Sequence, residues 1–345
     1  MKKIWTPISA AIVLTAMTGF VLLTPVNFVI WAPGPATDLL AVNNGRPVID
    51  ITGVDPHGSS GSILSTSMVA TSQDSTVTLP TLIISYILPN RAVMPRDAVY
   101  SPGQNLDEAQ EARRTSIETS REQAMAAGVR QAGIEVIEGP KVLTVRPNGP
   151  ANAILLPGDF IVAIDGTPMS TENDVRQYIR NNKQVGDQVV VTVLRLGQTQ
   201  ILTVPKLQGS STDGTLPTMG TTIGTGYLYT PNIRLNIDAS MGDPSQGLAL
   251  ALATFDLLTA SDHIQGSVVA AAGRISASGE VTAVEGINEH AASAASASAT
   301  IMIIARDNCA DITGRFPDLS IVPVTTLQEA VEALTAHSKG DLPTC

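Results

Sequence analysis

The chain has 345 residues, which is enough for two or three domains. Its formal net charge of −10 argues against a nucleic-acid partner, because phosphates are bound by lysine and arginine clusters. No G-x-x-x-x-G-K-[ST] run is present, which excludes a nucleotide-driven motor of that kind within this chain.

The N-terminus predicts a membrane anchor over residues 1–31. Lys2 and Lys3 precede a mostly apolar run, Ile8 to Trp31, that has no charged side chain and is long enough to span a bilayer. With the two lysines inside, the bulk of the chain would lie outside the cytoplasm, in a single-pass protein of the cell membrane. The alternative is a signal peptide that is cleaved, although the apolar run is long for one.

Residues 32–138 are predicted to be a β-rich extracytoplasmic segment with one helix. Short β-rich runs such as Ser62–Thr66 and Leu82–Tyr86 are separated by Gly, Asp, Ser and Pro. A polar helix is expected from Leu106 to about Gln131. Its charged residues are typical of a solvated face and suggest no function.

Residues 139–207 have a different pattern. The strand Val142–Val145 is followed by the turn Gly149-Pro150-Ala151, a buried strand within Leu156–Gly166, a helix over Asn173–Asn181 and an alternating strand over Gln188–Leu194. In this order, G-P-A, L-x-P-G-D-x-I and I-D-G resemble a PDZ domain of the kind associated with bacterial proteases.

That resemblance implies a peptide-binding site. A PDZ domain adds a peptide strand to the edge of its sheet and often grips a free C-terminal carboxylate. The expected site is the loop before Val142, which contains Gly139, Pro140 and Lys141. The amine of Lys141 could attract the carboxylate.

Residues 208–338 contain the most informative stretch, Asp238–Leu248. A strand-like run leads into a Gly/Pro turn, and Ser245 then stands at the start of an apolar helix, Leu248–Leu258. A serine hydroxyl there is exposed beside backbone N–H groups, as a serine nucleophile requires. The Pro-Ser-x-Gly-Leu sequence resembles the nucleophile motif of Lon-type serine proteases.

The Lon resemblance also shows a departure. The family uses a Ser-Lys dyad, and the position of its lysine falls on His290, which is 45 residues after Ser245. The threonine that usually positions that lysine aligns with Ala272, and the glycine before the motif proline is Asp243. No lysine occurs between Lys206 and Lys339, so the domain has no internal substitute.

Two interpretations follow from this departure. In the first, His290 is the base, and Asp243 could orient its imidazole in an Asp-His-Ser set. In the second, the catalytic pair has lapsed, and the chain is a PDZ peptide-binding or regulatory protein. An oxyanion would be held by the backbone of Gly242, Asp243 and Ser245, where a carboxylate at Asp243 opposes the developing charge.

The remaining expectations concern the cysteines and the partners. Cys309 and Cys345 could form one disulfide in an oxidising compartment, and residues 339–345 are read as a tail. No metal or organic cofactor is expected. The expected partners are protein or peptide substrates and the membrane, and a homo-oligomer of this chain is left open. The sequence therefore predicts an α+β multidomain protein: a transmembrane helix, a β-rich segment, a PDZ domain and a Lon-type α/β proteolytic domain. Its predicted activity is ATP-independent serine endopeptidase.

Overall fold

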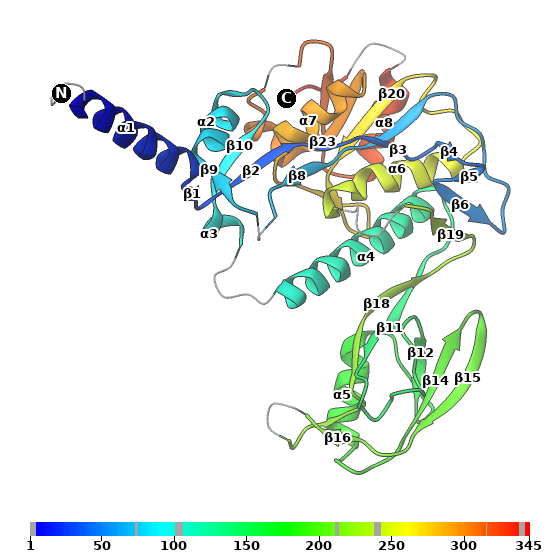
Figure 1. Ribbon diagram of the computed structural model, residues 1–345. Coiled ribbons are helices and arrows are strands. Elements are labelled where there is room, and N and C mark those ends of the chain that lie inside the picture. Colours follow the sequence, from blue (N-terminus) through cyan, green and yellow to red (C-terminus); the bar gives the residue numbers. More distant parts are fainter. Residues whose placement is uncertain are drawn as a thin grey trace. The chain divides into compact units, whose positions relative to one another are not determined.

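The computed structural model describes residues 5–72, 75–100, 106–210, 214–237, 243–314, 316–337 and 342–345 (Figure 1). The chain forms two compact units. The first combines residues 1–133 with residues 231–345, and the second comprises residues 134–230. This differs from the predicted order of separate domains, because residues 32–133 and the C-terminal part of the chain build one unit.

The N-terminal helix is shorter than the predicted anchor. Helix α1 spans Trp5–Leu23, and Phe28–Pro33 forms strand β2 instead of continuing the helix. Trp31, the last residue of the predicted apolar run, is 8% exposed within that strand. Among the helices of the described residues, none combines the length and the apolar character needed to cross a bilayer.

The central sheet of the first unit has five strands in the order β24-β23-β20-β7-β3. The first four are parallel, and β3 is antiparallel to β7. Their bounds are β3 (Thr37–Asp38), β7 (Ser62–Ser65), β20 (Val268–Ala272), β23 (Ile301–Ala305) and β24 (Ser320–Val324). Strand β7 therefore comes from the predicted β-rich segment and lies inside the predicted proteolytic domain.

Four helices pack on or beside this sheet: three contact strands of the sheet, and the fourth packs on one of those three (Figure 1). They are α4 (Leu106–Gln131), α6 (Gly247–Leu258), α7 (Ile287–Ser296) and α8 (Leu327–His337). Helix α4 packs along α6, and Gly128 permits their close approach because a Cβ there would stand 2.6 Å from the carbonyl oxygen of Ala251. The predicted solvated helix is thus a structural partner of the helix that follows Ser245.

Smaller elements complete the first unit. A three-stranded sheet has the order β10-β2-β8, and β1-β9, β4-β5, β6-β19 and β21-β22 are separate two-stranded sheets. Their bounds are β1 (Pro25–Val26), β4 (Val42–Asn43), β5 (Arg46–Pro47), β6 (Ile49–Thr52), β8 (Met68–Ala70), β9 (Val77–Thr78), β10 (Ala92–Pro95), β19 (Asn232–Leu235), β21 (Arg274–Ile275) and β22 (Val281–Thr282).

One predicted β element of this unit is wrong. Residues 82–86 lie in helix α2 (Leu79–Ile87), which has Pro80 in its first turn and is followed by the short helix α3 (Arg96–Val99). Residues 268–272 form a central parallel strand. The short pair β21-β22 forms a hairpin that turns at Gly279 with a positive φ of 89°.

The second unit is a sheet in the order β15-β14-β12-β11-β18, with β13 paired to β12 and helix α5 beside it. The bounds are β11 (Ile137–Val145), β12 (Phe160–Ile164), β13 (Thr167–Pro168), α5 (Glu172–Asn182), β14 (Val189–Arg195), β15 (Gln198–Val204), β16 (Gln208–Gly209), β17 (Pro217–Thr218) and β18 (Thr221–Leu228). Alternating side chains of β14 fill its apolar core, and Thr171 begins α5 with a capping box.

Strand β18 of the second unit was not predicted. It is antiparallel to β11 over the whole length of that strand, from Ile137↔Leu228 to Val145↔Thr221. Strand β11 therefore has a neighbour on each side, and β18 forms one edge of the sheet, as β15 forms the other.

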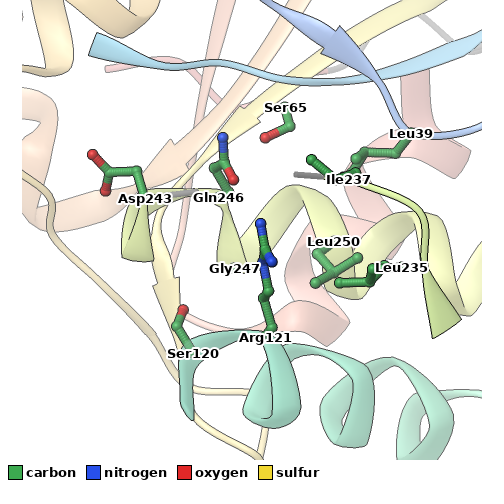
Figure 2. A pocket seen from close by; sticks show the side chains of 10 residues that line it. All are labelled: Leu39, Ser65, Ser120, Arg121, Leu235, Ile237, Asp243, Gln246, Gly247 and Leu250. Carbon is green, nitrogen blue, oxygen red and sulfur yellow. The ribbon is translucent and has the colours of Figure 1, made fainter. Parts of the chain in front are cut away.

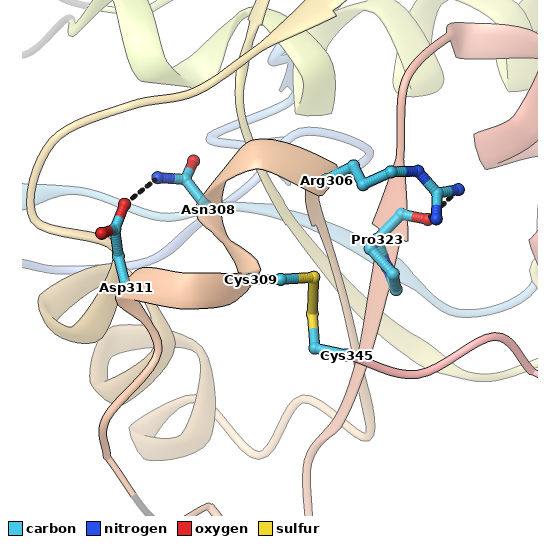
Figure 3. Close-up of a disulfide and its surroundings, with 6 residues drawn as sticks. All are labelled: Arg306, Asn308, Cys309, Asp311, Pro323 and Cys345. Carbon is cyan, nitrogen blue, oxygen red and sulfur yellow. Dashed lines mark hydrogen bonds between the residues drawn. A yellow bond between two sulfur atoms is a disulfide. The ribbon is translucent and has the colours of Figure 1, made fainter.

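The cysteines form the predicted disulfide, which joins Cys309 to Cys345 (Figure 3). Cys309 lies in the 3-10 helix η3 (Arg306–Asp311). The neighbouring Asn308 is buried, and its side-chain amide bonds both the N–H and the carbonyl oxygen of Val284 at 2.9 and 2.8 Å. The disulfide thus attaches the C-terminus to the short helix that holds the loop before α7.

Candidate active site

Ser245 lies in the 3-10 helix η2 (Pro244–Gln246), directly before α6. Asp243 caps this turn, because its carboxylate accepts a hydrogen bond from the Ser245 N–H at 2.8 Å. Pro244, at the first position of the turn, has no backbone N–H and so leaves no donor without a partner there. The Asp-Pro-Ser sequence therefore places Ser245 at the start of α6, as the motif predicts.

The turn is fixed from two other elements. The Ser245 carbonyl accepts from the N–H of Gly273 at 2.8 Å, and the Leu248 N–H donates to the Gly273 carbonyl at 2.9 Å. From α4, the Ser120 hydroxyl donates to the Pro244 carbonyl at 3.1 Å. A Cβ at Gly247 would stand 3.2 to 3.3 Å from atoms of Ile275 and Ser120, which accounts for the glycine in the motif.

His290 is fully buried in α7, and its ring is held by a residue that the sequence did not single out. Thr66, which directly follows β7 and is also fully buried, has its hydroxyl oxygen 3.0 Å from Nδ1 of His290. A proton on Nδ1 would be donated to this hydroxyl and would leave Nε2 free to accept another proton.

Thr66 stands next to the position where the family has its threonine. Strands β7 and β20 are parallel neighbours with Ser65 opposite Ala271, so Thr66 and Ala272 lie side by side where the two strands end. Ser245 is bound to Gly273, the residue after Ala272, and His290 is bound to Thr66. Both predicted catalytic residues are therefore attached to the C-terminal ends of adjacent strands, where open α/β sheets bind ligands.

The two atoms that would exchange a proton, Ser245 Oγ and His290 Nε2, are buried without hydrogen-bond partners. Among the described residues, neither Ser245 Oγ nor His290 Nε2 has a partner, although Ser245 is only 3% exposed. They are therefore not hydrogen-bonded to each other. A buried polar atom without a partner costs about 1–3 kcal/mol, and such atoms in native proteins often have a catalytic or solvent-binding role.

Asp243 does not form the expected Asp-His-Ser set. The Nδ1 atom of His290 bonds to Thr66 and Nε2 has no partner, so the carboxylate does not orient the ring. It acts on the imidazole only at a distance: burial lowers the pKa of His290, and the negative charge of Asp243 opposes that shift. The neutral ring therefore persists below the usual pKa near 6.5.

This shift predicts how stability depends on pH. The unfolded chain binds a proton at His290 near pH 6.5, whereas the folded chain resists it, so the free energy of unfolding should fall below that pH by up to about 1.4 kcal/mol per pH unit. His290→Gln should remove this part of the slope in urea unfolding between pH 7.5 and 5.5, values chosen to lie about one unit either side of that pKa. An unchanged slope would contradict it.

The matched control for this measurement is the exposed His57→Gln. Glu289 precedes His290 and is also buried, and burial raises the pKa of its carboxyl group. Its protonation stabilises the fold as the pH falls, which is the opposite sign. The contribution of His290 is therefore the difference between the pH slopes of the free energy of unfolding of wild type and His290→Gln. The slope of wild type alone contains both contributions.

A pocket lies beside the Ser245 turn, between α4, α6 and the sheet (Figure 2). Its lining is apolar on one side and polar on the other, with two side chains supplied by α4: Leu39, Ser65, Ser120, Arg121, Leu235, Ile237, Asp243, Gln246, Gly247 and Leu250. The close-up shows Asp243 and Gln246 at the end of the pocket nearest to the turn.

The predicted oxyanion and peptide sites are only partly as expected. Gly242 lies outside the described residues. The Ser245 N–H is engaged by Asp243, so it is not free to hold an oxyanion in this arrangement. Gly139, Pro140, Lys141 and Val142 lie in strand β11, where they pair with residues 223–226 of β18 instead of forming a loop, and their predicted role in peptide binding stays a prediction.

Comparisons with known proteins identify two segments. Residues 112–205 match the PDZ domain family, and residues 239–336 match the Lon protease (S16) C-terminal proteolytic domain. The chain thus contains a PDZ domain and a proteolytic domain of a serine peptidase family. The comparison with curated proteins finds no match.

The solved structures that are similar to part of this chain include PDZ domains. The PDZ domain of the SdrC-like protein from Listeria monocytogenes is 29% identical, with a TM-score of 0.23, over 25% of this chain and 86% of that chain. The corresponding domain from Listeria innocua is 30% identical, with a TM-score of 0.22, over 27% and 96%. A domain from Geobacillus thermodenitrificans is 34% identical, with a TM-score of 0.22, over 24% and 94%.

The sequence reasoning missed two contributors to the site. Thr66 ends the run Ser62–Thr66, and its only signal was a hydroxyl at the end of a short β-rich segment. Ser120 lies in the middle of a polar helix that resembles any solvated helix. Neither could be assigned before the pairing of β7 with β20 and the packing of α4 on α6 were known.

Proposed function

We propose that the chain is an ATP-independent serine endopeptidase, with Ser245 as nucleophile and His290 as its base. The observation that carries the proposal is the unpartnered, buried Ser245 Oγ at the start of α6, within the segment that matches a serine peptidase domain. The partner atom for its proton is the unpartnered Nε2 of His290. Ring orientation would come from Thr66.

The reaction divides between these residues in two steps. Ser245 Oγ attacks the scissile carbonyl carbon while its proton passes to Nε2 of His290, and the imidazolium then protonates the leaving amine. Water hydrolyses the acyl-enzyme with His290 again as base. Because Oγ and Nε2 are not bonded in the free protein, they must approach to within about 2.6–3.2 Å when substrate binds.

Asp243 limits this reaction in the arrangement seen here. Its carboxylate occupies the Ser245 N–H, which is the donor that would hold the oxyanion. The substrate must therefore displace the carboxylate before the tetrahedral intermediate is stabilised.

We place the catalytic unit outside the cytoplasm, attached to a membrane through the N-terminus. Two observations support this location. The Cys309–Cys345 disulfide is of a kind that persists in oxidising compartments. The basic start and the apolar residues after it have the charge asymmetry of an anchor whose following chain is exported.

The PDZ domain would capture substrate ends at the free edge of β18. Only β11 pairs with this strand among the described residues, and α5 contacts β18. A peptide strand can be added to an edge strand such as β18, whereas β11 pairs with β18 along its length and with β12 at Lys141. These pairings support a groove on residues 221–228.

Peptide binding should therefore protect β18 from amide hydrogen exchange. With a peptide that has a free C-terminal carboxylate, at about 100 times its Kd, opening of the bound strand should slow roughly 100-fold. Hydrogen exchange of the full chain measures this, with the amidated peptide as control. Protection confined to β11 or absent from the second unit would contradict the assignment.

The second candidate function is peptide binding without catalysis. One observation favours it: the Ser245 N–H donates its hydrogen bond to the Asp243 carboxylate, so this donor is not available to a substrate oxygen. A serine-reactive fluorophosphonate probe separates the two functions. Labelling of the full chain at Ser245 with turnover of unfolded casein, both lost in Ser245→Ala, supports the peptidase; a folded protein without labelling or turnover overturns it.

A further inference from the structure

A surface helix usually turns its apolar side chains toward the protein and its polar ones toward water. In helix α2 the apolar side chains are exposed and a polar side chain is buried. Its single buried side chain among the described residues is Ser85, at 1% exposure. Ile84 is 56% exposed, Tyr86 79% and Ile87 74%. A helix in water buries its apolar stripe, so these side chains require an apolar environment outside the protein.

The apolar surface continues onto α1, which contacts α2. Three consecutive residues of α1 are widely exposed: Ile12 at 63%, Val13 at 57% and Leu14 at 67%. Successive helical residues point about 100° apart, so apolar side chains face all directions around the helix. No residue of α1 carries a charge.

This distribution identifies the kind of partner. A second copy of the chain, or any other protein, would cover one side of such a surface. Lipid surrounds an apolar helix from every side and continues without interruption onto its neighbour α2. Arg91 follows α2 and comes within 3.5 Å of the hydroxyl of the buried Ser85, on the side of the helix opposite to the exposed apolar residues.

We propose that α2 lies in the boundary between the headgroups and the acyl chains of a lipid bilayer, beside α1. The exposed apolar residues Ile83, Ile84, Tyr86, Ile87 and Leu88 form the buried face of this contact. The contact depends on the surface of α2 and not on whether α1 crosses the bilayer, and it is independent of the proposed peptidase activity.

The position of α2 connects this contact to the site. Helix α2 contacts β2 and β10 of the three-stranded sheet, and α7, which carries His290, contacts β2 and β8 of the same sheet. A membrane contact at α2 would therefore hold the catalytic unit against the bilayer through one short, hydrogen-bonded sheet. Substrates would then be chain segments close to the membrane surface.

Single introduced cysteines test the contact in the full chain, because both native cysteines are joined in the disulfide. Ile84→Cys and Ile87→Cys would carry an environment-sensitive fluorophore. The matched controls are Val42→Cys in the same unit, where Val42 is 64% exposed, and Leu196→Cys in the second unit, where Leu196 is 98% exposed. Each protein is reconstituted in vesicles of phosphatidylcholine and phosphatidylglycerol, and flotation verifies that it is vesicle-bound.

We expect the α2 labels to show a blue shift and a loss of emission when the vesicles contain a lipid with a nitroxide near the headgroup. The control labels should show neither and should be quenched by iodide in water. Iodide quenching of the α2 labels to the same extent would overturn the proposal. A blue shift that depends on protein density and is indifferent to the nitroxide lipid would also overturn it, in favour of contact between copies.

Discussion

Replacing Ser245 with alanine should lower turnover of an unfolded substrate by about 10⁴-fold or more, because only binding contacts remain once the nucleophile is removed. His290→Gln should cost a similar factor, since glutamine fills much of the same space and cannot accept the serine proton. The double variant should be no slower than either single variant, because nucleophile and base act as one unit. Steady-state kinetics with a fluorogenic peptide measures all three.

The controls separate catalysis from folding. Thr66→Val keeps the volume at the end of β7 but removes the hydroxyl that is 3.0 Å from Nδ1 of His290. Its expected loss is smaller and falls mainly on kcat, because the base is present but less well oriented. Far-ultraviolet circular dichroism should match wild type for every variant. Multiplying effects in the double variant would show that Ser245 and His290 do not act together.

The same kinetics should show a shifted pH dependence. Burial lowers the pKa of His290, so the base remains neutral below pH 6.5. The acid limb of kcat/KM is therefore expected below that value, whereas an exposed histidine would place it at about 6.5. An acid limb above the usual histidine range would exclude His290 as the titrating base.

Breaking the Cys309–Cys345 disulfide should reduce the free energy of unfolding by about 3–4 kcal/mol, because a closed loop of 36 residues restricts the unfolded chain. The effect should extend to the site, because Asn308 beside Cys309 holds Val284 before α7. Urea unfolding of Cys345→Ser, followed by fluorescence, measures the loss of stability.

Three comparisons make this test specific. Cys309→Ser and the double Cys309→Ser/Cys345→Ser should lose the same stability as Cys345→Ser, since each removes one covalent bond. Reducing agent should lower wild type to the level of the variants and leave the variants unchanged. A wild-type protein whose unfolding midpoint is indifferent to reductant would contradict a bridge between these cysteines.

Local elements with strong patterns were predictable. Helix α4 has the predicted bounds, and the helices α5 and α6 are within a few residues of those expected, because each has helical periodicity with a start or stop signal. The Pro-Ser-x-Gly-Leu motif predicted the turn at Ser245 for the same reason: proline, glycine and a following apolar helix specify that turn locally.

Segments whose environment decides their structure were not predictable. The run Leu82–Tyr86 is rich in β-branched and aromatic residues, yet it forms α2, whose apolar side chains are exposed and whose Ser85 is buried. A pattern of this kind assumes that apolar side chains face a protein core. Where apolar side chains do not face a protein core, the same pattern predicts the wrong type of secondary structure.

The sequence by itself determined the existence of a PDZ domain and a Lon-type proteolytic domain, and it predicted Ser245 as the nucleophile, with His290 at the position of the expected lysine. The tertiary structure decided which distant segments meet. It brought Thr66 to His290 and Ser120 to the nucleophile turn, and it made β18 the edge of the PDZ sheet. These contacts join residues more than a hundred positions apart or depend on strand pairing, and a local pattern carries no information about either.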